Sequence, residues 1–277
     1  MSGERPEVSY ARRPAQNGAI WLRDAYRLVS GARLPWMLLL FLYYLVLGLI
    51  DLVPFIGQIA APILKPVFAV GFLAAAWSQE RGGTPEPKQL FQGFRSNLWA
   101  LIPLGVFLVV GITLAVLGTA LVDDGKLLDV LSGKSKFDDA LLADGQVQYA
   151  MLFAAACALP VMLALWFAPA LVVFQDCSAP VALRSSLSAA LANWKPIAVY
   201  GLLVFFLGGM VPGIATAAIA LLVPASLAFT IALVLLLPYL FLFIATLHVS
   251  DYVSYRDIFH AGEAQALEAA ETGTPAP

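Results

Sequence analysis

The sequence predicts an all-α protein, a bundle of six transmembrane helices with amphipathic helices along one membrane surface. Composition is the first reason: 61% of the 277 residues are apolar and 12% are charged, against about 45–50% and 25% in soluble domains. The second reason is the distribution of charge. No Asp, Glu, Lys or Arg occurs in the 55 residues between Lys195 and Asp251, nor in residues 96–122 or 145–175. Because a spanning helix needs about 20 mostly apolar residues, the long stretch has room for two spans and each shorter one for one.

Apolar runs place the six spans within a membrane domain of residues 18–258. Their approximate bounds are 34–52, 56–77, 100–121, 150–174, 196–211 and 224–249. Residues 212–223 are apolar as well, and they either extend one of the last two helices or form a short segment near the far surface. The terminal segments, residues 1–17 and 259–277, are polar or low in complexity, and we expect them to be disordered.

The basic residues predict that both termini are cytoplasmic, because cytoplasmic loops hold an excess of Lys and Arg. With six spans, twelve of the sixteen Lys and Arg residues fall on the side of the termini. Lys126, Lys134 and Lys136 instead share the loop of residues 122–148 with six Asp residues, so we place that loop on the extracytoplasmic side. No short apolar stretch with a small-residue cleavage site follows the polar start, and we expect the first span to act as its own insertion signal.

An amphipathic helix is predicted before each pair of spans, at residues 20–32, 88–98 and 179–194. The three apolar stripes are Trp21, Ala25, Leu28, Val29 and Ala32; Leu90, Phe91, Phe94 and Leu98; and Leu183, Leu187, Ala190, Leu191 and Trp194. Asn193 falls outside the third stripe. These helices either connect the spans and pack on the bundle, which we favour, or lie on the lipid surface as sensors.

The first and third pairs of spans are similar at an offset of 158 residues. This offset aligns Trp36 with Trp194, Pro54 with Pro212 and Pro66 with Pro224. It predicts a repeated unit of surface helix, span, proline-marked turn and span. Repeats in transporters often form the substrate site at their interface, but duplication of a stable bundle produces the same pattern. The repeat therefore leaves transport open.

Lys65 and Asp51 are the candidate functional residues, because ionisable groups inside a bilayer are rare and are often functional. Lys65 lies in the second span between Pro62 and Pro66, and Asp51 ends the first span. One interpretation is an ion pair between the two near the far surface. A second is that Lys65 extends to the outer headgroups. A third is that these residues contact a lipid headgroup or another ligand.

The motifs of common enzyme and metal sites are absent from the sequence. It contains no HExxH, GxSxG, paired CxxC or glycine-rich phosphate loop, and His248 and His260 are too few for a familiar zinc site. We therefore expect a protein that is not an enzyme, has no cofactor or nucleic-acid partner, and supports membrane or envelope organisation. Its partners would be membrane lipids, other membrane proteins or a second copy. The alternative is a permease or facilitator for a small molecule or lipid.

Four segments carry a resemblance to a known family: GAIWLRDAYRLVSGARLPWMLLL, VPFIGQIAAPILKPVFAVG, LFQGFR and SAPVALRSSLSAALANWKPIAVYGLL. Over about residues 18–255 the chain resembles uncharacterised six-span inner-membrane proteins of proteobacteria. It is more loosely similar to the membrane domains that accompany glycerophosphodiester phosphodiesterases, which also place a surface helix before a span. No phosphodiesterase catalytic domain is present in the sequence. The resemblance therefore implies a multi-pass location in the bacterial inner membrane, and no activity or site.

Overall fold

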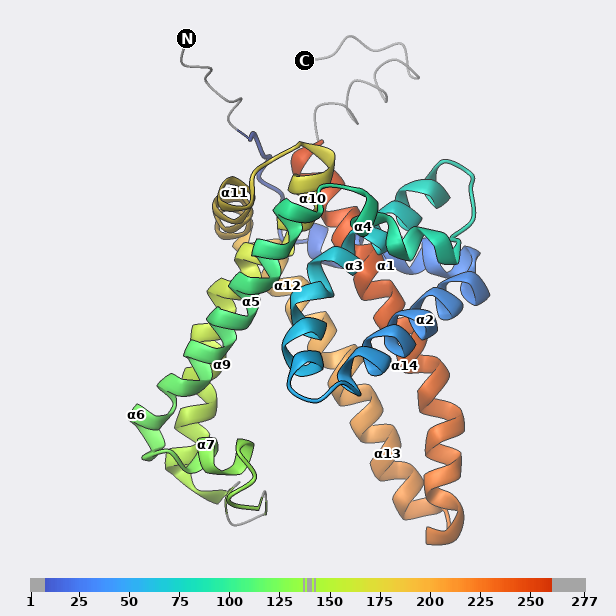
Figure 1. Ribbon diagram of the computed structural model, residues 1–277. Helices are drawn as coiled ribbons and strands as arrows, with labels where there is room; N and C mark the ends of the chain where they lie inside the picture. Colours follow the sequence, from blue (N-terminus) through green and yellow to red (C-terminus); the bar gives the residue numbers. More distant parts are fainter. Residues whose placement is uncertain (1–7, 137, 139–140, 142, 261–277) are drawn as a thin grey trace, which may run out of the picture. The chain divides into compact units, whose positions relative to one another are not determined.

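The computed structural model describes residues 8–136, 138, 141 and 143–260, and in this part of the chain it contains helices and turns but no strand (Figure 1). Six helical stretches are long and apolar enough to cross a membrane, which confirms the predicted fold class. The chain divides into two compact units. Unit 1 comprises Met1–Leu49, Phe68–Ser96 and Ser188–Pro277, and unit 2 comprises Ile50–Val67 and Asn97–Leu187.

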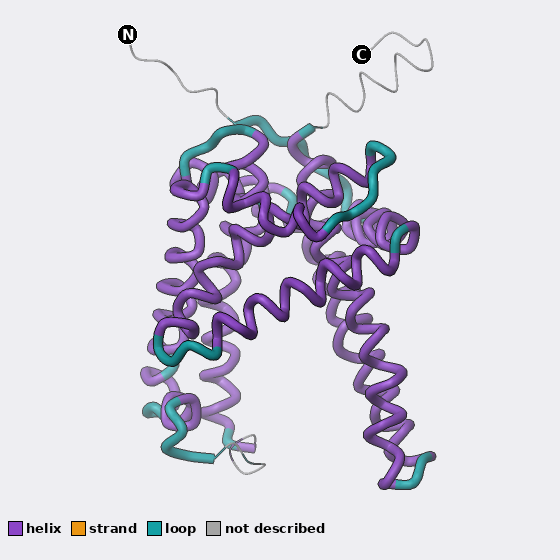
Figure 2. The backbone as a smooth tube through the Cα atoms, turned by 45° about the vertical axis from the view of Figure 1, so that its right-hand side comes forward, coloured by secondary structure: helices purple, strands orange, loops and turns teal. Residues whose placement is uncertain are grey.

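Unit 1 contains three of the long helical stretches in whole or in large part. Its elements are α1 (Asn17–Gly31), most of α2 (Arg33–Asp51), the second half of α3 (Ile56–Glu80), η1 (Pro87–Phe91), α4 (Gln92–Arg95), α12 (Trp194–Phe205), η2 (Phe206–Met210), α13 (Val211–Leu222) and α14 (Ala225–Phe259). In both ribbon views α2 runs obliquely to α14 (Figures 1 and 2). The described ends of the chain, Val8 and His260, lie at one end of this unit, which we call the terminal end.

The first amphipathic helix packs on the bundle. The α1 helix contacts α12 and α14, and its Trp21, Ala25 and Val29 are fully buried. Gly18 allows the closest approach, since a Cβ atom there would lie 2.1 Å from the carbonyl oxygen of Pro196. The apolar stripe that the sequence shows in this helix therefore faces other helices, as the packing interpretation predicts.

Aromatic side chains form the centre of unit 1. Tyr43 of α2 contacts Phe68 and Phe72 of α3 edge-on, with ring centroids 5.6 and 5.3 Å apart. His248 of α14 stacks on Phe72 with centroids 4.0 Å apart. Such pairs stabilise a core beyond the area that they bury. His248 thus packs as an aromatic ring between helices.

The second and third amphipathic helices differ from the sequence prediction. Residues 88–98 form two short helices, η1 and α4, because Pro87 and a capping box between Glu86 and Gln89 start a tight turn and the backbone leaves the helical region at Ser96. The α11 helix (Ala179–Ala192) forms, but Asn193 at its end is buried, whereas the predicted stripe residues Leu191 and Trp194 are 57% and 60% exposed. Small and polar residues make its contacts instead of the large apolar ones.

The fifth span is longer than predicted, because residues 212–222 extend it. The helix is continuous for 29 residues from Trp194 to Leu222, about 43 Å at 1.5 Å per residue. The short turn from this helix into α14, drawn in teal, lies at the lower end of the two helices in Figure 2. Both hairpin turns carry the same tripeptide, residues 52–54 and 222–224, Leu-Val-Pro. The proposed repeat is therefore wrong in one respect: Pro212 does not mark a turn, and Pro224 does.

Unit 2 is built around the pairing of two spans. Its elements are the first half of α3, α5 (Leu98–Gly118), α6 (Ala120–Asp123), α7 (Lys126–Leu131), α9 (Gly145–Trp166), α10 (Ala168–Phe174) and most of α11. Glycines permit close packing here: a Cβ atom on Gly105 would lie 2.0 Å from the carbonyl oxygen of Ile63, and one on Gly111 would lie 2.7 Å from the side chain of Val161. Because lipid does not drive apolar helices together, such close approach is a main source of their association.

A serine hydroxyl replaces a broken backbone hydrogen bond in the fourth span. Helix α9 ends at Trp166 and α10 begins at Ala168, next to Pro169, which has no amide proton. Ser186 of α11 accepts a hydrogen bond from the Phe167 amide (3.0 Å) and donates one to the Leu163 carbonyl (2.9 Å). The hydroxyl thus lies between the two groups that a regular helix would join directly. It explains why a polar residue is fully buried on α11.

Candidate functional site

Lys65 and Asp51, the residues that the sequence singles out, both have exposed side chains. Lys65 lies in the first half of α3 and Asp51 is the last residue of α2. No ion pair within 4.0 Å joins them, although both belong to the described part of the chain. The structure therefore does not form the predicted pair. Extension to headgroups or contact with a ligand stay open as roles for Lys65.

We expect Lys65→Met and Asp51→Ala to affect stability independently, because no ion pair links the two side chains. Thermal unfolding of both single variants and of the double variant should give a coupling free energy below about 0.5 kcal/mol. A coupling above about 1 kcal/mol would show that the pair forms in the membrane. If Lys65 holds an anionic ligand, Lys65→Met should fold normally and lose that ligand.

A polar network at the terminal end of unit 1 centres on Asp257 of α14. Its carboxylate forms an ion pair with the Arg13 guanidinium at 2.9 Å, and it accepts hydrogen bonds from the Asn17 amide and the Trp21 indole, both at 2.7 Å. Arg13 also donates twice to the Asp257 carbonyl oxygen, at 3.0 and 2.7 Å. The side chains of Arg13 and Asp257 are only 20% and 22% exposed. Asp257 thus joins the N-terminal segment, α1 and α14.

The N-terminal segment is held along residues 11–13. Asn193, at the start of α12, accepts a hydrogen bond from the Arg13 amide at 2.7 Å and donates one to the Ala11 carbonyl at 3.0 Å. The Ala11 amide donates to the Ile258 carbonyl at 2.8 Å. Residues 11–13 are therefore hydrogen-bonded to the bundle, within the segment of residues 1–17 for which we expect disorder. Residues 1–7 lie outside the described part.

Glu80, the last residue of α3, forms a second polar contact with α14. It pairs with Arg256 and accepts a hydrogen bond from the Tyr252 hydroxyl at 2.6 Å. Its neighbour Gln79 accepts from the Trp36 indole at 2.7 Å and donates to the Leu28 carbonyl at 2.6 Å. These bonds tie the ends of α1, α2, α3 and α14 together. Glu80, Gln79 and their partners thus satisfy one another's hydrogen-bonding groups.

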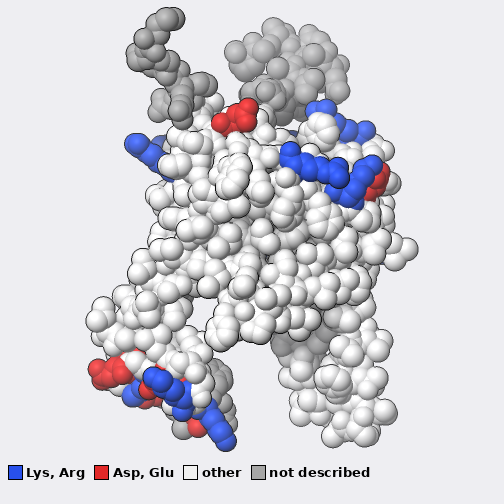
Figure 3. All heavy atoms as spheres, viewed as in Figure 1, with Lys and Arg blue, Asp and Glu red and all other residues white. Residues whose placement is uncertain are grey.

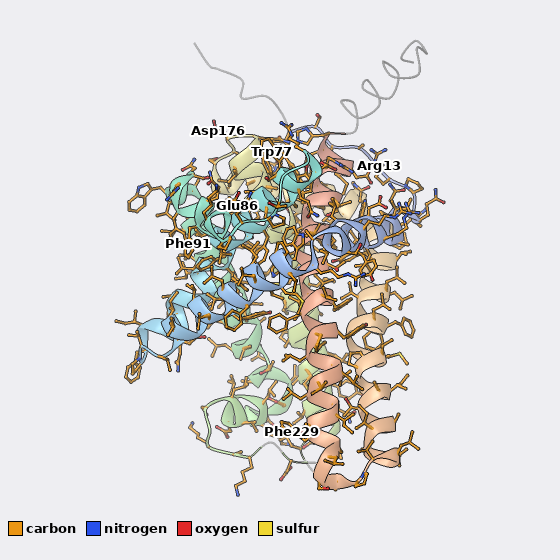
Figure 4. All side chains as sticks on the ribbon, turned by 90° about the vertical axis from the view of Figure 1, so that its right-hand side faces the viewer. Arg13, Trp77, Glu86, Phe91, Asp176 and Phe229 are labelled. Carbon is orange, nitrogen blue, oxygen red and sulfur yellow. The ribbon has the colours of Figure 1, made fainter. Side chains whose placement is uncertain are left out.

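Other cations at the terminal end have no carboxylate partner. Arg12, Arg33, Arg81, Arg95 and Lys195 are exposed, and none forms an ion pair with a described residue. Figure 3 shows the Lys and Arg side chains of unit 1 gathered at this end, and Figure 4 shows Arg13 and Trp77 there and Phe229 at the opposite end.

Two of these cations lie over exposed indole rings. The Arg81 guanidinium is 4.1 Å from the ring centroid of Trp77, and the Lys195 ammonium is 5.9 Å from that of Trp194. Trp77 is 41% exposed and Trp194 is 60% exposed. We call these pairs the aromatic–cation corners. Tryptophan beside a cation is typical of the boundary between apolar chains and headgroups, so the corners can bind anionic phosphate groups next to an apolar surface.

The acidic loop of unit 2 is locally ordered around two carboxylates. Asp123 accepts hydrogen bonds from the Gly125 and Leu127 amides at 3.0 and 2.8 Å, which caps α7. The Asp144 carboxylate pairs with Lys126 at 2.6 Å, and this hydrogen bond lowers the pKa of Asp144 below its ordinary value. No group of three or more metal-ligating side chains occurs among the residues described; Asp139 lies outside them. Asp123 and Asp144 are thus engaged in local structure.

The residues of the terminal network were not predicted as functional candidates. Arg13 and Trp21 were assigned only to orientation and to an apolar stripe, and Asp257 and Glu80 were not singled out. Their partners lie far apart in the sequence: Arg13 and Asp257 are 244 residues apart. One signal was available, namely that Glu80 and Asp257 are carboxylates close to the ends of predicted spans.

Comparison with known proteins found one relevant relative. The chain is 34% identical over 257 residues to a "probable inner membrane protein" of Burkholderia thailandensis, covering 90% of this chain and 93% of the relative. No family model matches the chain, and no solved structure matches it. The similarity extends over nearly the full length of both chains.

Proposed function

Since the chain belongs to the inner-membrane protein family of this Burkholderia thailandensis relative, we propose that it organises the membrane by binding anionic phospholipid headgroups, without catalysis. The relative and the six apolar helices indicate that the chain is an integral protein of the inner membrane. The geometry of the terminal end supports the binding of anionic headgroups. It needs no cofactor and no active site.

The aromatic–cation corners are the observation that carries this proposal. Arg81 directly follows Glu80 and Trp194 directly follows Asn193, so both corners lie next to the network that binds the end of α14. The network holds the helix ends that carry these indole rings. The two cations have no carboxylate to neutralise them within the described chain, so an anionic phosphate could do so. Each Lys or Arg near an anionic surface contributes about 1 kcal/mol.

Lipid retention by the purified protein tests the proposal. In nanodiscs of phosphatidylcholine with a minor share of phosphatidylglycerol, native mass spectrometry should show that the wild-type protein preferentially retains phosphatidylglycerol. Arg81→Gln/Lys195→Gln should lower this preference by about 30-fold, which corresponds to ~2 kcal/mol for two cations. The matched control is Lys134→Gln/Lys136→Gln, which removes the same charge from the unit 2 loop. Equal retention by both double variants would refute the corners as the binding site.

We expect both termini to be cytoplasmic and residues 122–148 to be extracytoplasmic, because of the distribution of Lys and Arg. In a background without Cys157 and Cys177, an impermeant maleimide added from outside should label a cysteine placed at Ser135 and miss one placed at Ser2 or Thr274. Labelling of either terminus from outside would reverse the orientation.

A permease or facilitator is the second candidate, and one observation favours it. The fifth span departs from regular helix at Phe206–Met210, near its middle, and the Tyr239 hydroxyl donates to the Leu207 carbonyl there at 2.6 Å. Interrupted spans with polar backbone groups at mid-depth are a feature of transporters. Uptake measured in proteoliposomes distinguishes the two functions, because lipid binding alone moves no solute.

A further inference from the structure

The fifth span contains a helical defect whose cause can be read from the backbone. Residues Phe206–Met210 form a π-helical turn, and the Val211 amide donates to the Phe206 carbonyl, five residues back. Residue 212 is proline, which has no amide proton. The Leu207 carbonyl therefore loses both of its normal backbone donors: the α-helical one at residue 211 is used elsewhere, and the π-helical one at residue 212 does not exist.

Tyr239 of the facing helix supplies the missing donor. Its hydroxyl donates to the Leu207 carbonyl at 2.6 Å across 32 residues of sequence. An unsatisfied carbonyl is costly in lipid, where no water replaces the bond. Tyr239 follows Pro238, the proline inside α14, so both helices of the hairpin have a proline close to this contact. The hydrogen bond therefore joins the two helices where each has a proline that interrupts its backbone hydrogen bonds.

The helices pack closely on the side of the defect that leads to the terminal end, and loosely on the side that leads to the turn between α13 and α14. The Phe243 ring covers Gly208, where an added Cβ would lie 2.5 Å from it, whereas Gly209 and Gly213 have nothing within 4 Å. Among the described residues, α13 has no buried side chain, and those of α14 begin at Ala245. Figure 4 shows Phe229 near the outer turn, and this side chain is 76% exposed. The outer half of the hairpin, residues 211–237, is thus held by its own two helices.

We propose that the π-turn Phe206–Met210 together with Pro238 is a hinge for the outer half of the hairpin, and that the Tyr239 hydroxyl holds it in the observed position. Helices bend sharply at π-turns and at prolines. The outer half changes its angle when the Tyr239–Leu207 bond opens. This inference depends on the hairpin alone and stands apart from lipid binding at the terminal end.

Spin-label distances across the hinge test the proposal. In a protein without native cysteines, labels at Leu202→Cys and Leu221→Cys occupy side chains that are 57% and 85% exposed, about 28 Å apart along a straight helix. Pulsed electron paramagnetic resonance in nanodiscs gives their distance distribution. Tyr239→Phe should raise the population with a shortened distance about three- to twenty-fold, the range expected for one interhelical hydrogen bond in a membrane. Tyr44→Phe is the control, since no hydrogen bond of its hydroxyl is recorded in the structure.

A second variant tests the contribution of the backbone defect independently of the tyrosine hydroxyl. Pro212→Ala restores an amide donor for the freed carbonyl, so it should narrow the distribution on its own and abolish the effect of Tyr239→Phe. The proposal is overturned if Tyr239→Phe behaves like Tyr44→Phe. It is also overturned if Pro212→Ala leaves the distribution unchanged, a result that does not depend on the folding of the tyrosine variant.

Discussion

Gly105→Ala is expected to destabilise unit 2 strongly, because the new Cβ atom would lie 2.0 Å from the Ile63 carbonyl oxygen and 2.6 Å from its Cα and carbonyl carbon. These are backbone atoms, which cannot move aside as a side chain would. The helices α3 and α5 must therefore separate along their contact. Overpacking typically costs about 1–3 kcal/mol, and a clash with backbone lies at or above the upper end. Denaturation in mixed micelles should show the loss as a lower midpoint.

Gly48→Ala is the matched control for this prediction. Gly48 is also a glycine in a span, but nothing lies within 4 Å of the Cβ position. Alanine is the better helix former, so the control should be neutral or slightly stabilising. Similar midpoints for the two variants would show that α3 and α5 do not pack as closely as the structure indicates.

Asp257→Ala is expected to have the second-largest effect. It removes the carboxylate that accepts from Arg13, Asn17 and Trp21 together, and it leaves a poorly exposed guanidinium with only its bonds to the backbone carbonyl of residue 257. Unsatisfied polar groups cost about 1–3 kcal/mol each when buried, and partial exposure reduces this, so we expect a total of about 2–3 kcal/mol. Thermal unfolding would measure the loss. Limited proteolysis should cut near Ala11 and Arg12 faster in the variant.

The control for Asp257→Ala is Asp24→Ala. Asp24 pairs with Arg23 and Arg27, whose side chains are 55% and 68% exposed. Such surface pairs contribute about 0–1 kcal/mol. If both variants lost the same stability, the network around Asp257 would be no more than a surface ion pair.

The number and positions of the spans could be predicted because lipid imposes a simple rule on composition. Each span is a stretch without charge that is long enough to cross the bilayer, and stretches of this kind are visible without knowledge of any contact. The length of the fifth span stayed open in the sequence analysis, because Pro212 was interpreted as the mark of a turn. A proline can continue a transmembrane helix where another group satisfies the freed carbonyl, and the Tyr239 hydroxyl that does so is 32 residues away.

Local patterns failed where contacts are formed by small or polar residues. On α11 the large side chains Leu191 and Trp194 are exposed, while Ser186 and Asn193 are buried and hydrogen-bonded. Small residues four positions apart, Gly71 with Ala75 and Gly209 with Gly213, are candidates for close helix approach. It occurs at Gly71, where a Cβ would lie 2.6 Å from the Leu90 backbone, and not at Gly209 or Gly213. Spacing along one helix identifies candidates, but the facing element decides which of them are used.

The candidate site was predicted least well, because it depends on distant parts of the chain. Lys65 attracted attention as a charge within a span, yet it has no ion pair with Asp51. The terminal network and the aromatic–cation corners combine residues from the N-terminal segment, α1, α3, α12 and α14. Each is an ordinary residue in its own segment. Only their juxtaposition distinguishes them.

Copurification from the native membrane tests the central claim most directly. The protein should be extracted in native lipid by a membrane-solubilising polymer, and the bound lipids, proteins and solutes identified by mass spectrometry. Lipid binding by the corners predicts enrichment of anionic phospholipid over the bulk membrane, lost in Arg81→Gln/Lys195→Gln and kept in Lys134→Gln/Lys136→Gln. Lipid in bulk proportions around the wild-type protein, together with specific retention of one small solute whose uptake is lost on deletion, would contradict it and establish the permease.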